Sequence, residues 1–143
     1  MGFRDSKNFE DITLIAPCGI NCGLCRAYLR QKKPCGGCRG GSANKSDSCL
    51  NCKIKNCGVL RQNRLEFCFK CSKFPCERIE HLDLRYRTRY HVSPIENLAV
   101  VKTRGIQYFL NQEKGRWTCR ECGGTICMHK GHCIQCGAES PVE

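Results

Sequence analysis

The stretch that decides the fold is residues 119–137, with the sequence CRECGGTICMHKGHCIQCG. It contains two Cys-x-x-Cys-Gly turns, Cys119 to Cys122 and Cys133 to Cys136, with ten residues between them. The glycine after each turn lets the backbone bend so that amide N–H groups can point at the sulfur atoms. Two such turns facing each other supply four thiolates at about 2.3 Å from a zinc ion. The spacing therefore predicts a closed zinc ribbon near the C-terminus.

Three other side chains of this stretch have metal-binding chemistry. His132 directly precedes Cys133 and is an alternative ligand, and Cys127 and His129 lie between the two turns. If the four cysteines close the site, no coordination position remains for catalysis. We therefore expect a structural zinc, with Cys127 as a spare thiol and the histidines exposed to solvent in the loop.

Cysteines are abundant in the whole chain, 16 among 143 residues. This content is typical of disulfide scaffolds and of metal-binding proteins. Residues 1–10 carry charges where a signal peptide needs apolar residues, and no stretch approaches the roughly 20 apolar residues of a membrane span. We therefore expect a soluble, cytoplasmic protein, and structural disulfides are rare in that reducing compartment. The Cys-x-x-Cys spacing then favours metal.

Eleven of the cysteines lie in residues 18–76, which is one fewer than three four-thiolate sites need. All eleven are predicted metal ligands: Cys18, Cys22, Cys25, Cys35, Cys38, Cys49, Cys52, Cys57, Cys68, Cys71 and Cys76. The cysteine spacing of residues 49–57 recurs in residues 68–76. One recurrence predicts two similar metal-binding turns and not a solenoid, which needs at least about three units.

Spacing alone favours one particular grouping of these cysteines. The pairs in residues 35–38 and 49–52 would share one metal, and Cys57 would join the three cysteines of residues 68–76. The triplet in residues 18–25 then lacks a fourth ligand and is open to another partner or to an exchangeable metal.

The spacing of Cys18, Cys22 and Cys25 also matches the cysteines that hold a four-iron cluster in radical S-adenosylmethionine enzymes. Leu24 stands where those enzymes usually have an aromatic residue, and 143 residues cannot supply their barrel. Zinc is therefore the favoured metal in this unit. An iron–sulfur cluster, in a redox protein or a cluster carrier, is the alternative.

The formal charge of +11 on its own suggests a polyanionic partner, but metal-bound thiolates lower this charge. A zinc with four thiolates carries a net −2, so three such sites would leave about +5. The best candidates for nucleic-acid contact are Arg85, Tyr86, Arg89 and Tyr90, because a helix would place arginines and rings on neighbouring faces. The competing interpretation is that the tyrosines dock this helix while the arginines stay solvated.

Large apolar residues are concentrated between Ile79 and Trp117 and predict helices there. One would start near Pro75, and another at residues 93–96, where Ser-Pro-Ile-Glu forms a capping box. Shorter elements are a helix over residues 22–33 and at most a short strand over residues 12–16.

We predict a small, irregular α+β fold that is stabilised by metal. Its parts would be a Cys-rich metal-binding unit at residues 1–76, a helical segment at residues 77–115 that packs on it, and the zinc ribbon at residues 116–143.

Four segments carry a resemblance to a known family: PCGINCGLC (17–25), CGGCRG (35–40), CLNCKIKNC (49–57) and CFKCSKFPC (68–76). In this order they resemble a bacterial and archaeal family of unknown function, DUF family 3795, over about residues 16–80. The tail from Ser93 to Gly137 resembles an extension found in some members. The resemblance implies a prokaryotic, cytoplasmic, metal-binding protein and assigns no catalytic residue.

The sequence lacks the common hydrolase motifs H-E-x-x-H, P-loop and nucleophile elbow. Four histidines provide little acid–base chemistry. We therefore expect a zinc-binding protein that acts as a binding or adaptor module, for nucleic acid or for a protein partner, and no enzyme. The iron–sulfur protein is the alternative function.

Overall fold

The structure is a computed structural model that describes residues 11–41, 43–54 and 56–140. The outer ends of the predicted first and last units, residues 1–10 and 141–143, therefore lie outside the described residues. Among the residues described, no helix is both long enough and apolar enough to cross a membrane.

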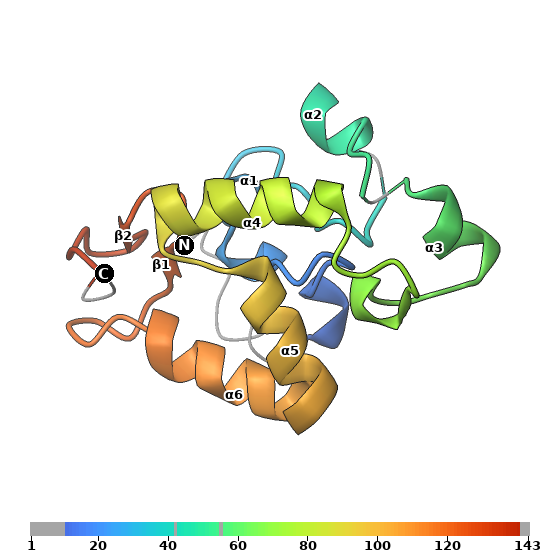
Figure 1. Cartoon of the computed structure of the whole chain (residues 1–143). Coiled ribbons are helices and arrows are strands. Elements are labelled where there is room, and N and C mark those ends of the chain that lie inside the picture. Colours follow the sequence, from blue (N-terminus) through green and yellow to red (C-terminus); the bar gives the residue numbers. More distant parts are fainter. Residues whose placement is uncertain (1–10, 42, 55, 141–143) are drawn as a thin grey trace.

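Three helices form the regular part of the molecule. They are α4 (Glu77–Tyr90), α5 (Pro94–Arg104) and α6 (Ile106–Trp117). α4 and α6 lie on either side of the first turns of the chain, and α5 connects them at one end (Figure 1). The segments that carry α2 (Asp47–Leu50) and α3 (Gly58–Gln62) lie outside these three helices (Figure 1).

The sequence between α4 and α5 explains why the chain changes direction there. The Ser93 hydroxyl accepts the backbone N–H of Glu96 at 3.1 Å, so the predicted helix start at Ser93 is confirmed. Ser93 also donates a hydrogen bond to the Asp83 carboxylate on α4, which accepts the Ile95 N–H at 3.0 Å. Arg87 pairs with the same carboxylate. A single buried aspartate thus fixes the angle between the two helices.

The N-terminal unit consists of short turns joined by irregular segments. Its elements are η2 (Ile12–Leu14), η3 (Cys22–Leu24), α1 (Arg26–Leu29), α2 (Asp47–Leu50), α3 (Gly58–Gln62) and η4 (Cys68–Lys70). Where at most a short strand was expected, residues 12–14 form a 3-10 turn, and Ile15 makes only an isolated bridge with Asn21. The helix expected over residues 22–33 is reduced to α1, because Cys25 and Arg30 both have extended backbone conformations.

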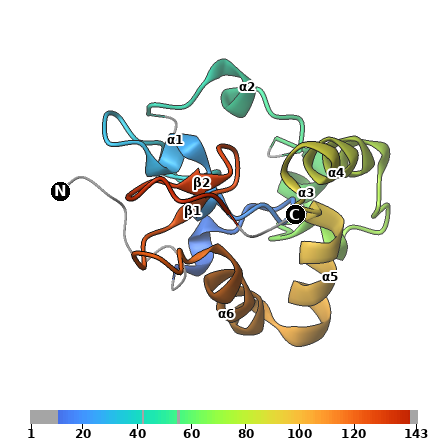
Figure 2. The same ribbon diagram turned by 90° about the vertical axis from the view of Figure 1, so that its left-hand side faces the viewer.

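The C-terminal residues form a small two-stranded ribbon. β1 (Ile126–Cys127) pairs with β2 (His132–Cys133) in an antiparallel register in which Ile126 faces Cys133. An isolated bridge between Thr118 and Thr125 continues the pairing toward the first cysteine turn. Figure 2 shows this ribbon beside the segment that carries α1.

The core draws on every part of the chain. Ile15 and Leu24 of the N-terminal unit, Leu98 and Phe109 of the helices, and Ile126 of the ribbon are fully or almost fully buried in one cluster. A second cluster consists of Leu14, Tyr28, Leu29 and Cys127. The ribbon therefore contributes to the core of the molecule.

Candidate metal centre

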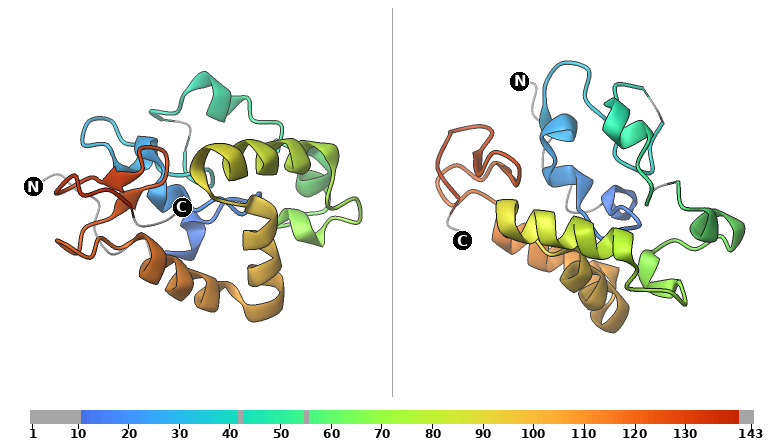
Figure 3. Two further views of the ribbon diagram at one scale, coloured as in Figure 1. Left: turned by 60° about the vertical axis from the view of Figure 1, so that its left-hand side comes forward. Right: turned by 45° about the horizontal axis from the view of Figure 1, so that its top comes forward.

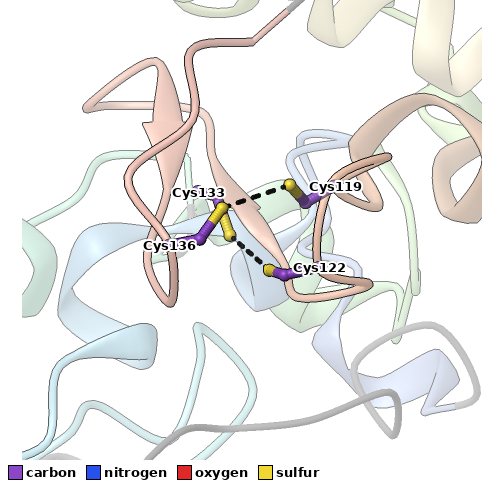
Figure 4. A group of neighbouring side chains, drawn as sticks. All are labelled: Cys119, Cys122, Cys133 and Cys136. Atoms are coloured by element: carbon purple, nitrogen blue, oxygen red, sulfur yellow. Dashed lines mark hydrogen bonds between the residues drawn. The ribbon is translucent and has the colours of Figure 1, made fainter.

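Four cysteine sulfurs meet at the ribbon. The Sγ atoms of Cys119, Cys122, Cys133 and Cys136 all lie within 4.8 Å of one another (Figure 4). The Sγ atoms of Cys119 and Cys136 are 3.6 Å apart, and those of Cys122 and Cys133 are 3.5 Å apart. A tetrahedral ion with metal–sulfur distances of about 2.3 Å requires sulfurs about 3.8 Å apart. The four sulfurs therefore already lie close to the spacing that a tetrahedral metal site requires.

Each cysteine turn directs backbone amides at its own sulfurs. The N–H of Gly124 donates to Cys122 Sγ at 3.3 Å, and the N–H of Gln135 donates to Cys133 Sγ at 3.4 Å. These donors stabilise the negative charge of a metal-bound thiolate. Gly123 and Gly137 have φ values of +78° and +79°, which explains the glycine after each Cys-x-x-Cys pair.

Gly124 is needed for a different reason, because a side chain at this position would crowd the sulfurs. A Cβ atom at this position would lie 3.1 Å from Cys133 Sγ and 3.2 Å from Cys122 Sγ. A side chain here would therefore compete with the metal for space.

Two thiols of the group have strongly shifted pKa values. Backbone N–H groups of Cys122 and Glu121 help lower the pKa of the Cys119 thiol to about 7. The N–H of Gly124 lowers the pKa of Cys122, but partial loss of solvation and the neighbouring thiols outweigh this and raise it to about 12. Thiolates this close together repel one another, and a divalent cation offsets that repulsion. With four sulfur ligands the site would be closed, which suits structure and not catalysis.

The ribbon is docked on the N-terminal unit by its hairpin. The N–H of Met128 donates to the Leu24 carbonyl at 3.1 Å, and Cys127 is completely buried. The Nδ1 atom of His129 accepts the Arg26 N–H at 3.3 Å. Nε2 must then carry the ring proton, and it lies 3.2 Å from the Tyr86 hydroxyl on α4.

The expectation of a solvent-exposed His129 is therefore wrong. Its ring packs against Tyr90 with centroids 4.9 Å apart, and burial lowers its pKa. No local pattern reveals this position, because its partners Arg26 and Tyr86 are distant in the sequence. His132 is only half-buried, and its Nδ1 lies 3.2 Å from the Cys133 carbonyl.

The predicted ligands of the N-terminal unit are drawn together less tightly. Within residues 11–41, 43–54 and 56–140, only the ribbon cysteines form a group of three or more ligands with all donor atoms within 4.8 Å. Cys22 and Cys38 are nevertheless adjacent, because the Cys38 N–H donates to Cys22 Sγ at 3.4 Å. Spacing had placed Cys38 with the cysteines of residues 49–52 and gave no signal for this contact.

Two further features of that unit concern individual cysteines. The N–H of Cys68 donates to the Pro17 carbonyl at 2.9 Å, which brings η4 beside Cys18. Burial raises the pKa of Cys18, and burial together with Cys76, Cys57 and Cys71 raises the pKa of Cys68 to about 12. Cys68 therefore lies in the electrostatic field of the three cysteines with which spacing grouped it. All eleven N-terminal cysteines remain predicted ligands.

The four residues proposed for nucleic-acid contact all lie on α4. Arg85 and Arg89 are exposed, whereas Tyr86 and Tyr90 are half-buried, with ring centroids 5.0 Å apart. Both rings face His129 of the ribbon. The arginines therefore present charge to solvent while the tyrosines contact the ribbon, and the nucleic-acid role stays a prediction.

Part of the chain matches a known protein family. Residues 14–81 match a family described as "Protein of unknown function (DUF3795)", which confirms the resemblance drawn from the cysteine spacing. The match ends in the first turns of α4 and leaves the ribbon outside. No curated protein and no solved structure matches the chain.

Proposed function

We propose that this chain is a zinc-stabilised binding or adaptor module in which Cys119, Cys122, Cys133 and Cys136 hold one structural zinc ion. The observation that carries the proposal is the convergence of these four sulfurs within 4.8 Å on two turns that donate N–H groups to them. Zinc has no geometric preference of its own and favours closed four-thiolate sites in structural roles.

The ribbon gives this zinc a role beyond its own hairpin. In the segment between its cysteine turns, the Met128 N–H donates to the Leu24 carbonyl, and His129 contacts both Arg26 and Tyr86. Zinc holds that segment in place and so stabilises the contact between the N-terminal unit and α4. The exposed Arg85 and Arg89 lie on the same helix and offer a basic surface to a partner.

Cobalt substitution tests the metal site directly. Reduced, metal-free chain titrated with Co²⁺ should develop the intense visible bands of tetrahedral sulfur coordination. One equivalent of zinc should abolish the part of this absorbance that comes from the ribbon site. Cys136→Ser should lack that part of the absorbance, whereas Cys127→Ala, at a cysteine outside the group of four, should keep it. Identical cobalt spectra for wild type and Cys136→Ser would refute the site.

A further inference from the structure

A cavity of about 280 Å³ opens where three elements of the molecule meet. These are the C-terminal end of α4, the end of α6 and the ribbon hairpin, and Figure 3 shows the first and third of them side by side in both views. Its lining residues are Arg89, Tyr90, His91, Trp117, Met128, His129, Lys130, Gly131, His132, Glu139 and Ser140. No residue of the metal centre belongs to this lining.

The rim of the cavity is rich in positive charge. Arg89 on α4 and Lys130 on the ribbon hairpin are exposed cations, His91, His129 and His132 add three imidazoles, and Glu139 is the one acidic side chain of the lining. An excess of positive charge in a cleft concentrates anionic ligands.

Backbone carbonyls at the C-terminal end of α4 already have hydrogen-bond donors. The Arg116 guanidinium donates a hydrogen bond to the carbonyl of His91, and the N–H of Val92 donates to the Tyr86 carbonyl at 3.3 Å. Both donors come from outside the helix.

The cavity also has an aromatic wall. The half-buried ring of Tyr90 belongs to its lining, as do the almost completely buried Trp117 and Met128. An aromatic wall beside cationic side chains suits a ligand that joins a flat ring to an anionic group. Two cations match the two negative charges that a phosphate monoester carries near neutral pH.

We propose that this cavity binds a phosphate monoester attached to a flat ring, of about the size of a mononucleotide. Arg89 and Lys130 hold the phosphate, and the ring lies against Tyr90. Glu139 repels the anion from one side of the rim and so limits how it can be oriented. Free mononucleotides and the 5′-phosphorylated ends of oligonucleotides share this chemistry.

The inference rests on the proposed function in one respect: the zinc ribbon positions Lys130 on its hairpin. Binding is therefore measured on zinc-loaded full chain whose metal content has been determined first. If the chain holds its zinc but does not bind the phosphate monoester, the ligand site alone is refuted. If the chain holds no zinc, the proposed function is refuted.

Trp117 is the only tryptophan of the chain, and because it lines the cavity its fluorescence reports on ligand binding there. Titrations use adenosine monophosphate, adenosine, inorganic phosphate, and a short oligonucleotide with or without a 5′-phosphate, with calorimetry as a second readout. The monophosphate should bind saturably and at least tenfold more tightly than adenosine. Binding of the phosphorylated oligonucleotide as well would identify a nucleic-acid end as a source, and binding of the mononucleotide alone would identify the free ligand.

Charge-matched variants complete the test. Arg89→Gln with Lys130→Gln should weaken monophosphate binding at least tenfold, and Glu139→Gln should strengthen it. Lys102→Gln with Arg104→Gln removes the same charge from exposed positions on α5 and should change affinity less than twofold. The proposal is overturned if no phosphate monoester binds saturably, if adenosine binds equally well, or if both double variants lose the same affinity.

Discussion

Replacement of Glu113 by glutamine should make the protein less sensitive to alkaline pH. Glu113 lies on α6 and is 4 % exposed. Its carboxyl group faces the Trp117 indole and the Asn21 amide, whose buried N–H groups lack a hydrogen bond of regular geometry. Burial raises the pKa of Glu113 to about 7, against the opposing effects of Arg116, Trp117 and Asn21.

The sign and size of the effect follow from this pKa. The folded chain holds the proton more tightly than the unfolded chain, whose glutamate has the ordinary value of 4.5. The associated stability is complete below about pH 4.5 and is lost as pH rises through about 7. One pKa unit corresponds to about 1.4 kcal/mol, so the total loss at high pH is about 3 kcal/mol, of which about 1 kcal/mol falls between pH 6 and pH 8.

Guanidinium unfolding of zinc-loaded, reduced protein at pH 6 and pH 8 measures the effect. Wild type should lose about 1 kcal/mol more than Glu113→Gln over this interval, and the pH dependence of metal binding cancels in the comparison. Glu96→Gln, at an exposed glutamate on α5, is the control and should follow wild type. Parallel pH dependences for wild type and Glu113→Gln would refute a buried, proton-binding carboxyl group.

Three further predictions follow from the ribbon and from α4. His129→Ala removes the acceptor of the Arg26 N–H and the partner of Tyr86, and should lower the unfolding free energy by about 1–3 kcal/mol in denaturant titrations. Because burial lowers the pKa of His129, its contribution should be complete above pH 6.5 and fade below it, and an equal loss at pH 5 and pH 8 would contradict this. Gly124→Ala should weaken zinc binding in a chelator competition, because the alanine Cβ would lie 3.1 Å from the nearest sulfur. Unchanged zinc affinity would show that the turn can shift to accommodate the added atom. Arg85→Gln with Arg89→Gln should reduce the salt dependence of any RNA binding by up to about two in log–log slope, and an unchanged slope would exclude this surface.

The sequence predicts the four-cysteine group of the ribbon well because its determinants are local. Cys119 and Cys122, like Cys133 and Cys136, are joined by one turn, and the following glycines have the positive φ that such turns need. Once two similar turns exist, a short hairpin is enough to bring them together. The helix start at Ser93 was predictable for the same reason, since an N-cap depends on four consecutive residues.

The rest of the site depends on contacts between distant segments. His129 meets Arg26 across 103 positions in the sequence, and nothing around it distinguishes it from an exposed loop histidine. Glu113 sits in a polar stretch of α6, and it is buried beside Asn21, which is distant in the sequence. The contact of Cys38 with Cys22 likewise arises from the fold of irregular segments, for which spacing offers several equivalent pairings.

Zinc content per chain, measured on reduced protein prepared without oxygen, tests the four-cysteine centre most directly. Cys122→Ser combined with Cys136→Ser alters the two exposed members of the group, and Cys127→Ala alters a cysteine outside it. The double variant should hold one zinc ion fewer than wild type, and Cys127→Ala should hold the same number. Equal zinc in the double variant and wild type, or iron with acid-labile sulfide in place of zinc, would contradict the account.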